Sequence, residues 1–127
     1  MKLKLTTWDR LTIVQMIGRL QGDAALMHKA IKVFDAVDLT EEERQEINLR
    51  QIGDSLQWDD PLRKWDVSIP DREAVLLVKR SVQNARSWVA AKAREVAGLH
   101  EALGLDWPPK DGEGGEKGEI GGKREAG

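Results

Sequence analysis

Hydrophobic and polar residues alternate at the start of the chain, where the sequence MKLKLT places Leu3 and Leu5 on one side and two lysines on the other. A period of two is typical of a short strand with one buried face. The spacing then changes to the three-and-four repeat of a helix, which Thr6 or Thr7 caps and which glycines end by Gly22. The sequence therefore predicts an N-terminal strand that leads directly into a helix.

Two more helices are predicted in the front half of the chain. Asp23 is placed to cap a helix over about residues 24–37. Thr40, followed three residues later by Glu43, has the form of a capping box, and consecutive glutamates suit the positive end of a helix dipole. This third helix is expected to end near Glu46. The predicted buried stripe of the second helix is Leu26, Ala30 or Met27, Ile31, Phe34 and Val37.

Residues 47–69 favour strands. Apolar residues precede and follow the turn sequence GDS, with Leu56 and Trp58 alternating about Gln57, and this arrangement predicts an antiparallel hairpin. The sequence WDVSIP alternates again and predicts a further strand, which Pro70 ends.

From residue 71 to residue 103 no residue type interrupts a helical pattern. A straight helix of this length would be roughly 50 Å long, against ~30 Å for a small domain. The helix therefore either projects and pairs with another chain or bends, and the bend is expected between Asn84 and Ser87, because Asn and Ser compete for backbone hydrogen bonds. The apolar positions that step by three and four are Val75, Val78, Val82, Ala85, Val89, Val96, Leu99 and Leu103.

Together these elements predict an α+β fold that is mainly helical, with an N-terminal strand, three helices, a small antiparallel hairpin or sheet and a long C-terminal helix. We expect one globular domain over residues 1–106. Residues 107–127 are rich in glycine and in charges of both signs and are predicted to form a disordered tail. The order of strand, three helices, hairpin and closing helix is also that of a winged helix.

Composition argues against several classes of function. The chain has no cysteine, so it has no disulfide, no Cys-ligated zinc and no thiol nucleophile. It has no apolar run of the ~20 residues that a membrane span requires and no apolar segment of a secretory signal, so we expect a cytoplasmic protein. His28 and His100 have no metal-binding spacing and are expected at the surface or its boundary. We therefore predict no enzyme activity, no metal and no cofactor.

The charge distribution argues against nucleic acid as the partner. Residues 1–60 hold eight Lys and Arg against eleven Asp and Glu, whereas residues 61–106 hold eight against six. In a winged helix, the third helix would present four glutamates with Arg44 to the phosphates and would repel them. We expect these glutamates to lie near the basic edge of the long helix instead. A winged-helix regulator that binds nucleic acid remains the alternative function.

The sequence LQWDDPLRKWDVSIP contains two Trp-Asp pairs seven residues apart. The preferred interpretation is a loop between two strands whose tryptophans, Trp58 and Trp65, both pack on the core. Two alternatives are a stacking platform for a ligand and a loop that contacts another protein, since tryptophan is enriched at binding hot spots. Trp58 and Trp65 are therefore candidate contact residues for a protein partner.

The end of the long helix provides the second set of candidate contact residues. Val96, Leu99 and Leu103 extend past what a small core is expected to cover, and Lys92 stands at the start of this stretch. An uncovered apolar stripe usually marks an interface. We expect these four residues to bind a protein partner or a second copy of the chain.

The pattern LTTWDRLTIVQMIGRLQGD, followed by LTEEE, GDSLQWD and VSIP, resembles a group of short proteins found in phages and prophages. The resemblance covers about residues 3–75 and consists of helix caps and turns. It implies a small accessory protein that acts by binding, and it assigns no functional residues. The function expected from the sequence is thus non-catalytic binding to a host or virion protein, in the host cytoplasm.

Overall fold

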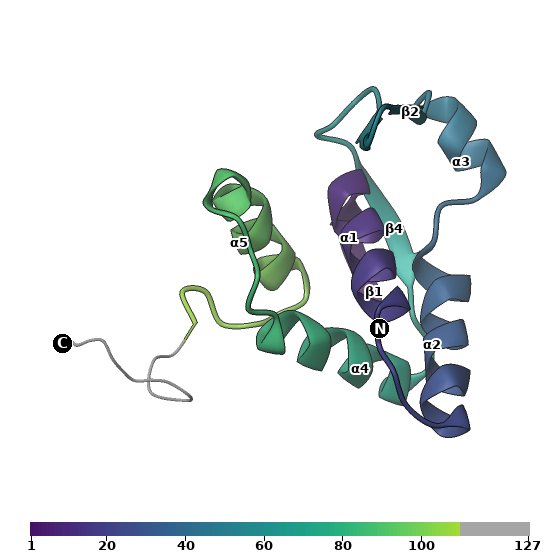
Figure 1. The fold of residues 1–127 in the computed structure, drawn as a ribbon, viewed down its shortest axis with the longest axis vertical. Helices are drawn as coiled ribbons and strands as arrows, with labels where there is room; N and C mark the ends of the chain where they lie inside the picture. Colours follow the sequence, from purple (N-terminus) through teal and green to yellow (C-terminus); the bar gives the residue numbers. More distant parts are fainter. Residues whose placement is uncertain (110–127) are drawn as a thin grey trace, which may run out of the picture.

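The computed structural model describes residues 1–109, and in these residues it confirms the predicted α+β class (Figure 1). Most elements are helical, and the strands form two small antiparallel sheets. In chain order the elements are β1 (Lys2–Thr6), α1 (Thr7–Gly18), α2 (Ala24–Val37), α3 (Glu41–Glu46), β2 (Arg50–Ile52), β3 (Ser55–Gln57), β4 (Lys64–Ser68), α4 (Arg72–Asn84), the short 3-10 helix η1 (Ala90–Lys92) and α5 (Ala93–Ala102).

The strands β1 and β4 pair although they lie far apart in the sequence. Leu3 is opposite Val67, and Leu5 is opposite Trp65. Both strands alternate buried and exposed positions, and these four side chains are the buried ones. The two strands therefore join through one apolar face, as the alternation in the sequence predicts.

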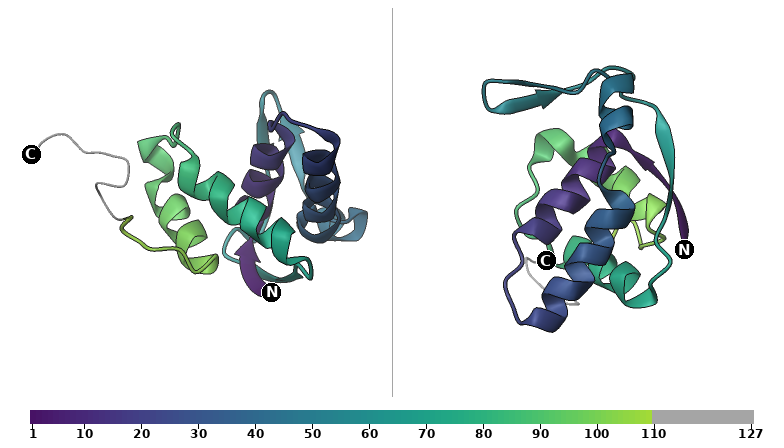
Figure 2. Two further views of the ribbon diagram at one scale, coloured as in Figure 1. Left: turned by 90° about the horizontal axis from the view of Figure 1, so that it is seen from below. Right: turned by 90° about the vertical axis from the view of Figure 1, so that its right-hand side faces the viewer.

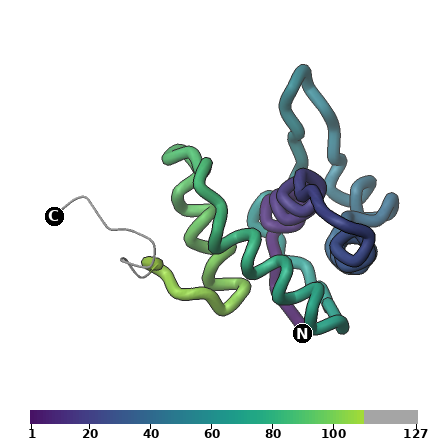
Figure 3. Tube along the Cα trace, turned by 60° about the horizontal axis from the view of Figure 1, so that its bottom comes forward, coloured from purple at the N-terminus to yellow at the C-terminus, as the bar shows by residue number. Residues whose placement is uncertain are grey.

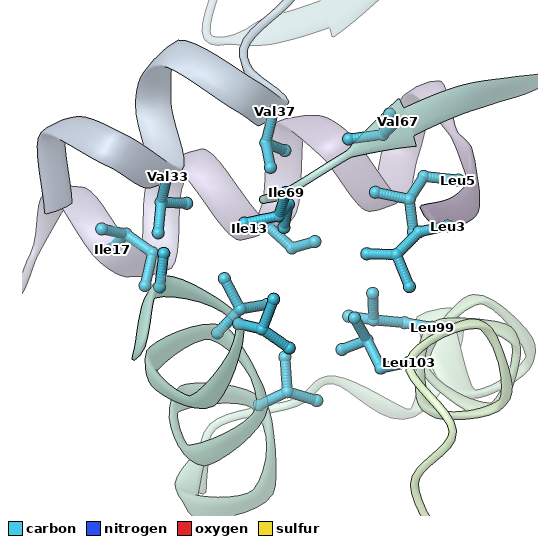
Figure 4. Packing of buried hydrophobic residues seen from close by; sticks show 14 of the residues in the cluster. Leu3, Leu5, Ile13, Ile17, Val33, Val37, Val67, Ile69, Leu99 and Leu103 are labelled. Carbon is cyan, nitrogen blue, oxygen red and sulfur yellow. The ribbon is translucent and has the colours of Figure 1, made fainter. Parts of the chain in front are cut away.

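The helices α1, α2 and α5 contact these two strands, and α4 packs against α1 and α2 to complete the core. Figure 4 shows side chains from α1, α2 and α5 turned towards the same interior as those of β1. Fully burying an aliphatic side chain contributes about 1.5–3 kcal/mol, so this cluster is the main source of stability. The labelled members include Ile13 and Ile17 of α1, Val33 and Val37 of α2, Leu3 and Leu5 of β1, and Leu99 and Leu103 of α5.

The predicted stripe of α2 is correct at Ala30 and Val37, which are buried, but wrong at Ile31, which is exposed. The buried position is Val33 instead. The contacting face follows the spacing 30, 33, 37, because α2 packs against both α1 and α4 along a single line.

Arg10 of α1 ties together the end of α2 and the start of α3. Its Nε donates to the carbonyl oxygen of Val37 at 2.8 Å, and its Nη2 donates to that of Asp38 at 2.9 Å. Both terminal nitrogens also donate to the Glu43 carboxylate, at 3.2 and 3.0 Å. Burial raises the pKa of Glu43, but hydrogen bonds from Arg10 and the Thr40 N–H, with the Arg10 charge, hold it below its ordinary value of 4.5.

The acidic helix α3 therefore faces α1 and not the basic edge of the C-terminal helices, and that prediction is wrong. Its ion pairs join Glu43 to Arg10, Glu46 to Arg63 and Arg44 to Asp38. Within the part of the chain that the structure describes, no ion pair links α3 to α4 or α5. The reason is that α4 lies against α1 and α2, near the end of α2 that is away from α3 (Figure 1).

The predicted hairpin is present as β2 and β3, with Ile52 opposite Ser55. It forms a sheet of its own, separate from β1 and β4. Every residue of β3 is exposed, and the hairpin extends away from the helices (Figures 2 and 3). The order of elements that suggested a winged helix is thus present, but the hairpin does not extend the main sheet.

The long C-terminal helix is interrupted between α4 and α5, in the region where a bend was expected. The backbone of Ala85 is extended, with ψ of 134°, and so is that of Val89, with ψ of 140°. Between them, Trp88 packs against the core, with its ring 6.4 Å from that of Trp8. The break turns the chain so that α5 returns to the domain and contacts β1 and α1.

This fold-back corrects the expectation of an uncovered apolar stripe. Val96, Leu99 and Leu103 are 3%, 0% and 1% exposed, respectively. Leu99 and Leu103 belong to the core cluster that includes the leucines of β1. Val96 lines a separate small cavity with Trp88 and His100. The three side chains therefore form no free surface, whereas Lys92 is exposed. The same apolar spacing serves a core helix because the interruption brings α5 back to the domain.

The two histidines differ in their exposure to solvent. His28 is exposed, but His100 is buried, so the expectation of a surface or boundary position is wrong for His100. Its Nδ1 lies 2.8 Å from the Val96 carbonyl oxygen, and its ring lies 5.0 Å from that of Trp107. Trp107 is thus in contact with α5, although it was assigned to the tail. The rest of the predicted tail, from residue 110, lies outside the described residues.

Candidate functional site

A groove of about 820 Å³ lies between β1 and α5. The start of α1 and the loop that leads from Trp58 to Lys64 complete its walls. Along α5 it runs past Arg94, Gly98 and Ala102, which follow one another at helical spacing.

One wall of the groove is the unpaired edge of β1. Met1 and Ile69 exchange two backbone hydrogen bonds, of 2.8 and 2.9 Å. Because bonded and non-bonded pairs alternate in an antiparallel ladder, Lys2 and Lys4 turn their N–H and C=O groups away from β4. The same alternation turns the N–H of Thr6 away from β4. This N–H donates a hydrogen bond to the Asp9 carboxylate at 3.0 Å.

Lys2 and Lys4 therefore present four backbone groups at the edge of the sheet. Within residues 1–109, no other element donates to or accepts from these groups. Their side chains are exposed on the outer face of the strand. The groove thus contains a short open strand edge whose nearest side chains are cationic.

Positive charge predominates in the groove. Its lining includes five basic residues and three acidic ones. Lys4 pairs with Asp66 on β4 at 2.6 Å, but both side chains are largely exposed, so the pair is weak. Among the described residues the other four basic side chains form no ion pair, and they remain available to an anionic ligand. The basic residues are Lys2, Lys4, Lys64, Lys92 and Arg94, and the acidic residues are Asp9, Glu95 and Glu101.

Asp9 is already engaged in the fold. Its carboxylate accepts from the Thr6 N–H while the Thr6 hydroxyl accepts from the Asp9 N–H at 3.1 Å, which forms the capping box of α1. Burial raises the pKa of Asp9 above its ordinary value, and the hydrogen bonds with Thr6 and the charge of Lys64 offset only part of this rise. Asp9 therefore acts as a helix cap.

Two indoles and an exposed leucine give the groove apolar surface. Trp8 and Trp58 are half-buried and line it, and Leu62 in the adjoining loop is 87% exposed. The Nε1 of Trp58 is buried and has no hydrogen-bond partner among the described residues. Tryptophan beside a basic rim is typical of protein-binding surfaces.

Trp65 is not part of this surface. It is 6% exposed, its Nε1 donates to the Thr7 hydroxyl at 2.9 Å, and the Arg63 guanidinium lies 3.8 Å from its ring centre. The core interpretation is thus confirmed for Trp65, and Trp58 is partly buried and also packs against this core while it lines the groove. Of the six candidate contact residues, only Lys92 and Trp58 lie in the groove.

Gly98 leaves the α5 wall open. A Cβ atom built at this position meets no atom within 4 Å apart from its chain neighbours and the backbone of its own helix. The neighbouring groove residue on the same face, Ala102, is also small. A larger residue at position 98 would therefore enter the groove without displacing the core, and this allows a steric test of the site.

The structure offers little support for other kinds of site within residues 1–109. No group of three or more His, Cys, Asp or Glu side chains there could hold a metal ion. None of the helices in that range is both long enough and apolar enough to cross a membrane. A smaller cavity of about 370 Å³ lies beside Trp88, Val96 and His100, and its lining is mainly apolar.

Comparison of the chain with protein-family models, with curated proteins and with solved structures finds no match.

The sequence did not identify most of the groove. Lys2 and Lys4 were assigned to the outer face of a strand, which is correct, but the pairing partner of that strand could not be inferred. Lys64 and Arg94 carry no motif and become neighbours of β1 only when β4 and α5 pack on it. The available signal was the pair of lysines on a short strand, since lysine is frequent at open strand edges.

Proposed function

We propose that the chain is a non-catalytic binding module that holds a segment of another protein in the groove between β1 and α5. The observation that carries this proposal is the open edge of β1, which lies inside a groove lined by two indoles and a basic rim. Backbone groups at a strand edge are a ready template for a segment from another chain. A cytoplasmic accessory role, with a host or virion protein as partner, is part of the proposal.

The composition of the groove favours protein over nucleic acid. Glu95 and Glu101 of α5 lie on the same wall as Arg94 and would repel a phosphate backbone along that side. The chain as a whole has a formal net charge of -2, which gives no long-range attraction for nucleic acid. A protein segment with only a few charges tolerates such a mixed wall.

A steric block of the groove tests the proposal. Gly98→Met should abolish partner binding, because the new side chain occupies the groove, while the fold is kept or stabilised by up to ~1 kcal/mol. Gly18→Met is the matched control, since a Cβ at Gly18 also meets no atom within 4 Å and Gly18 does not line the groove. The measurement is affinity capture from cells of the native host with the wild type and both variants in parallel.

We expect the wild type and Gly18→Met to capture equal amounts of the same partner. Gly98→Met should capture at least tenfold less of it. A partner retained equally by all three proteins would place the binding surface elsewhere and refute the proposal.

A further inference from the structure

The geometry of β1 specifies what kind of segment can bind. The free N–H and C=O groups belong to Lys2 and Lys4, which are two residues apart. Only an extended chain matches this repeat, because backbone groups that face one edge recur at every second residue of a strand. A helix satisfies its own backbone groups and would leave the β1 edge unpaired.

The existing partner of β1 shows which side chains suit its outer face. Asp66 of β4 is directly opposite Lys4, and their side chains form an ion pair of 2.6 Å. A strand added to the other edge would place its own alternate side chains beside Lys2 and Lys4 on the same face. Lysines there would repel a second copy of β1, which carries the same two lysines, and would attract carboxylates.

The other face of an added strand would meet a different surface. Its remaining side chains would turn towards α5, where Gly98 and Ala102 leave room for small or branched apolar groups. The Trp58 indole also lines the groove and adds apolar ring surface for the bound segment. The groove thus suits a chain that alternates acidic and apolar residues.

From this arrangement we infer that the ligand is an acidic, extended segment of another protein, which binds by adding a strand to the free edge of β1. Its acidic residues lie opposite Lys2 and Lys4, and apolar residues between them face α5. This inference rests on the proposed function and names the chemistry of its partner.

Synthetic peptides added to the full chain test the inference. The probe is a capped peptide of sequence Gly-Ser-Glu-Val-Glu-Val-Glu-Ser-Gly, and its charge control carries Lys in place of Glu. Two further versions have N-methyl groups on either the Glu or the Val amides, which block alternate edges of the peptide strand. Binding is measured by calorimetry and by the NMR shifts of the Lys2 and Lys4 amides.

We expect the acidic peptide to bind and to shift both amides, and the basic peptide to bind at least tenfold more weakly. One methylated version should bind like the parent and the other at least tenfold more weakly, because only one edge of the peptide faces β1. Equal effects of the two methylations would refute strand addition, and equal binding of the acidic and basic peptides would refute the charge preference.

Two other outcomes would also overturn the inference. The first is no binding of the acidic peptide at millimolar concentration. The second is that a ten-nucleotide oligothymidylate shifts the NMR signals of the same amides at a lower concentration than the peptide does. If capture still depends on Gly98 in either case, the groove remains the binding site and only the assignment of its ligand fails.

Discussion

Replacing Leu99 by Asp should unfold the chain or bring it close to unfolding. Leu99 is fully buried in α5, at the centre of the contact with β1. Removing a buried leucine side chain costs about 2–5 kcal/mol, and an unpaired carboxylate in the same place adds a further cost. The sum is comparable with the total stability of a small domain, ~5–15 kcal/mol. Urea denaturation followed by circular dichroism measures the loss.

Lys92→Asp provides the control for this substitution. It introduces the same side chain at the N-cap of α5, an exposed position where Asp is favoured, and should leave stability unchanged or raise it by up to ~1 kcal/mol. If Leu99→Asp changed stability as little as Lys92→Asp does, α5 would not belong to the core. Its apolar stripe would then be the free contact surface that the spacing of Val96, Leu99 and Leu103 first suggested.

Trp65→Ala should cause the second large loss of stability, lowering the free energy of unfolding by about 3–5 kcal/mol. The indole fills the inner face of β4 opposite Leu5, and the substitution leaves a cavity there. It also removes the donor to the Thr7 hydroxyl and the ring that lies under the Arg63 guanidinium. The midpoint of urea unfolding, with an unchanged slope, should report this as a loss of stability of the folded state.

Trp58→Ala is the natural comparison, because each of the two tryptophans begins a Trp-Asp pair. Trp58 is half-buried and has no hydrogen-bond partner for its Nε1 among the described residues, so its loss should cost only about 1 kcal/mol. Equal losses for the two substitutions would contradict the assignment of Trp65 to the core and Trp58 to the groove.

The features that the sequence predicted correctly depend on residues close together in the chain. Thr6, one of the two caps expected for the first helix, and Thr40, with its predicted capping box, are both N-caps that accept from a residue three positions later. The alternation of Leu3 and Leu5 likewise predicts a buried face without knowledge of its partner. Caps and alternation can be inferred from the sequence because their physical cause is local.

The features that the sequence could not predict depend on long-range packing. An apolar stripe at Val96, Leu99 and Leu103 has the same spacing whether it covers a core or binds a partner. The deciding feature is the break around Trp88, which returns α5 to β1. The groove has the same origin, because it exists only when β1, the loop after Trp58 and α5 meet.

The central claim is that the groove contains an open edge of β1 that a partner can use. Amide hydrogen exchange of the free chain, resolved by residue with NMR, tests it most directly. The amides of Leu3 and Leu5, which face β4, should be protected, and that of Lys4 should exchange at nearly the rate of an unstructured chain. Strong protection of the Lys4 amide in the free chain would show that the edge is already covered and would contradict the claim.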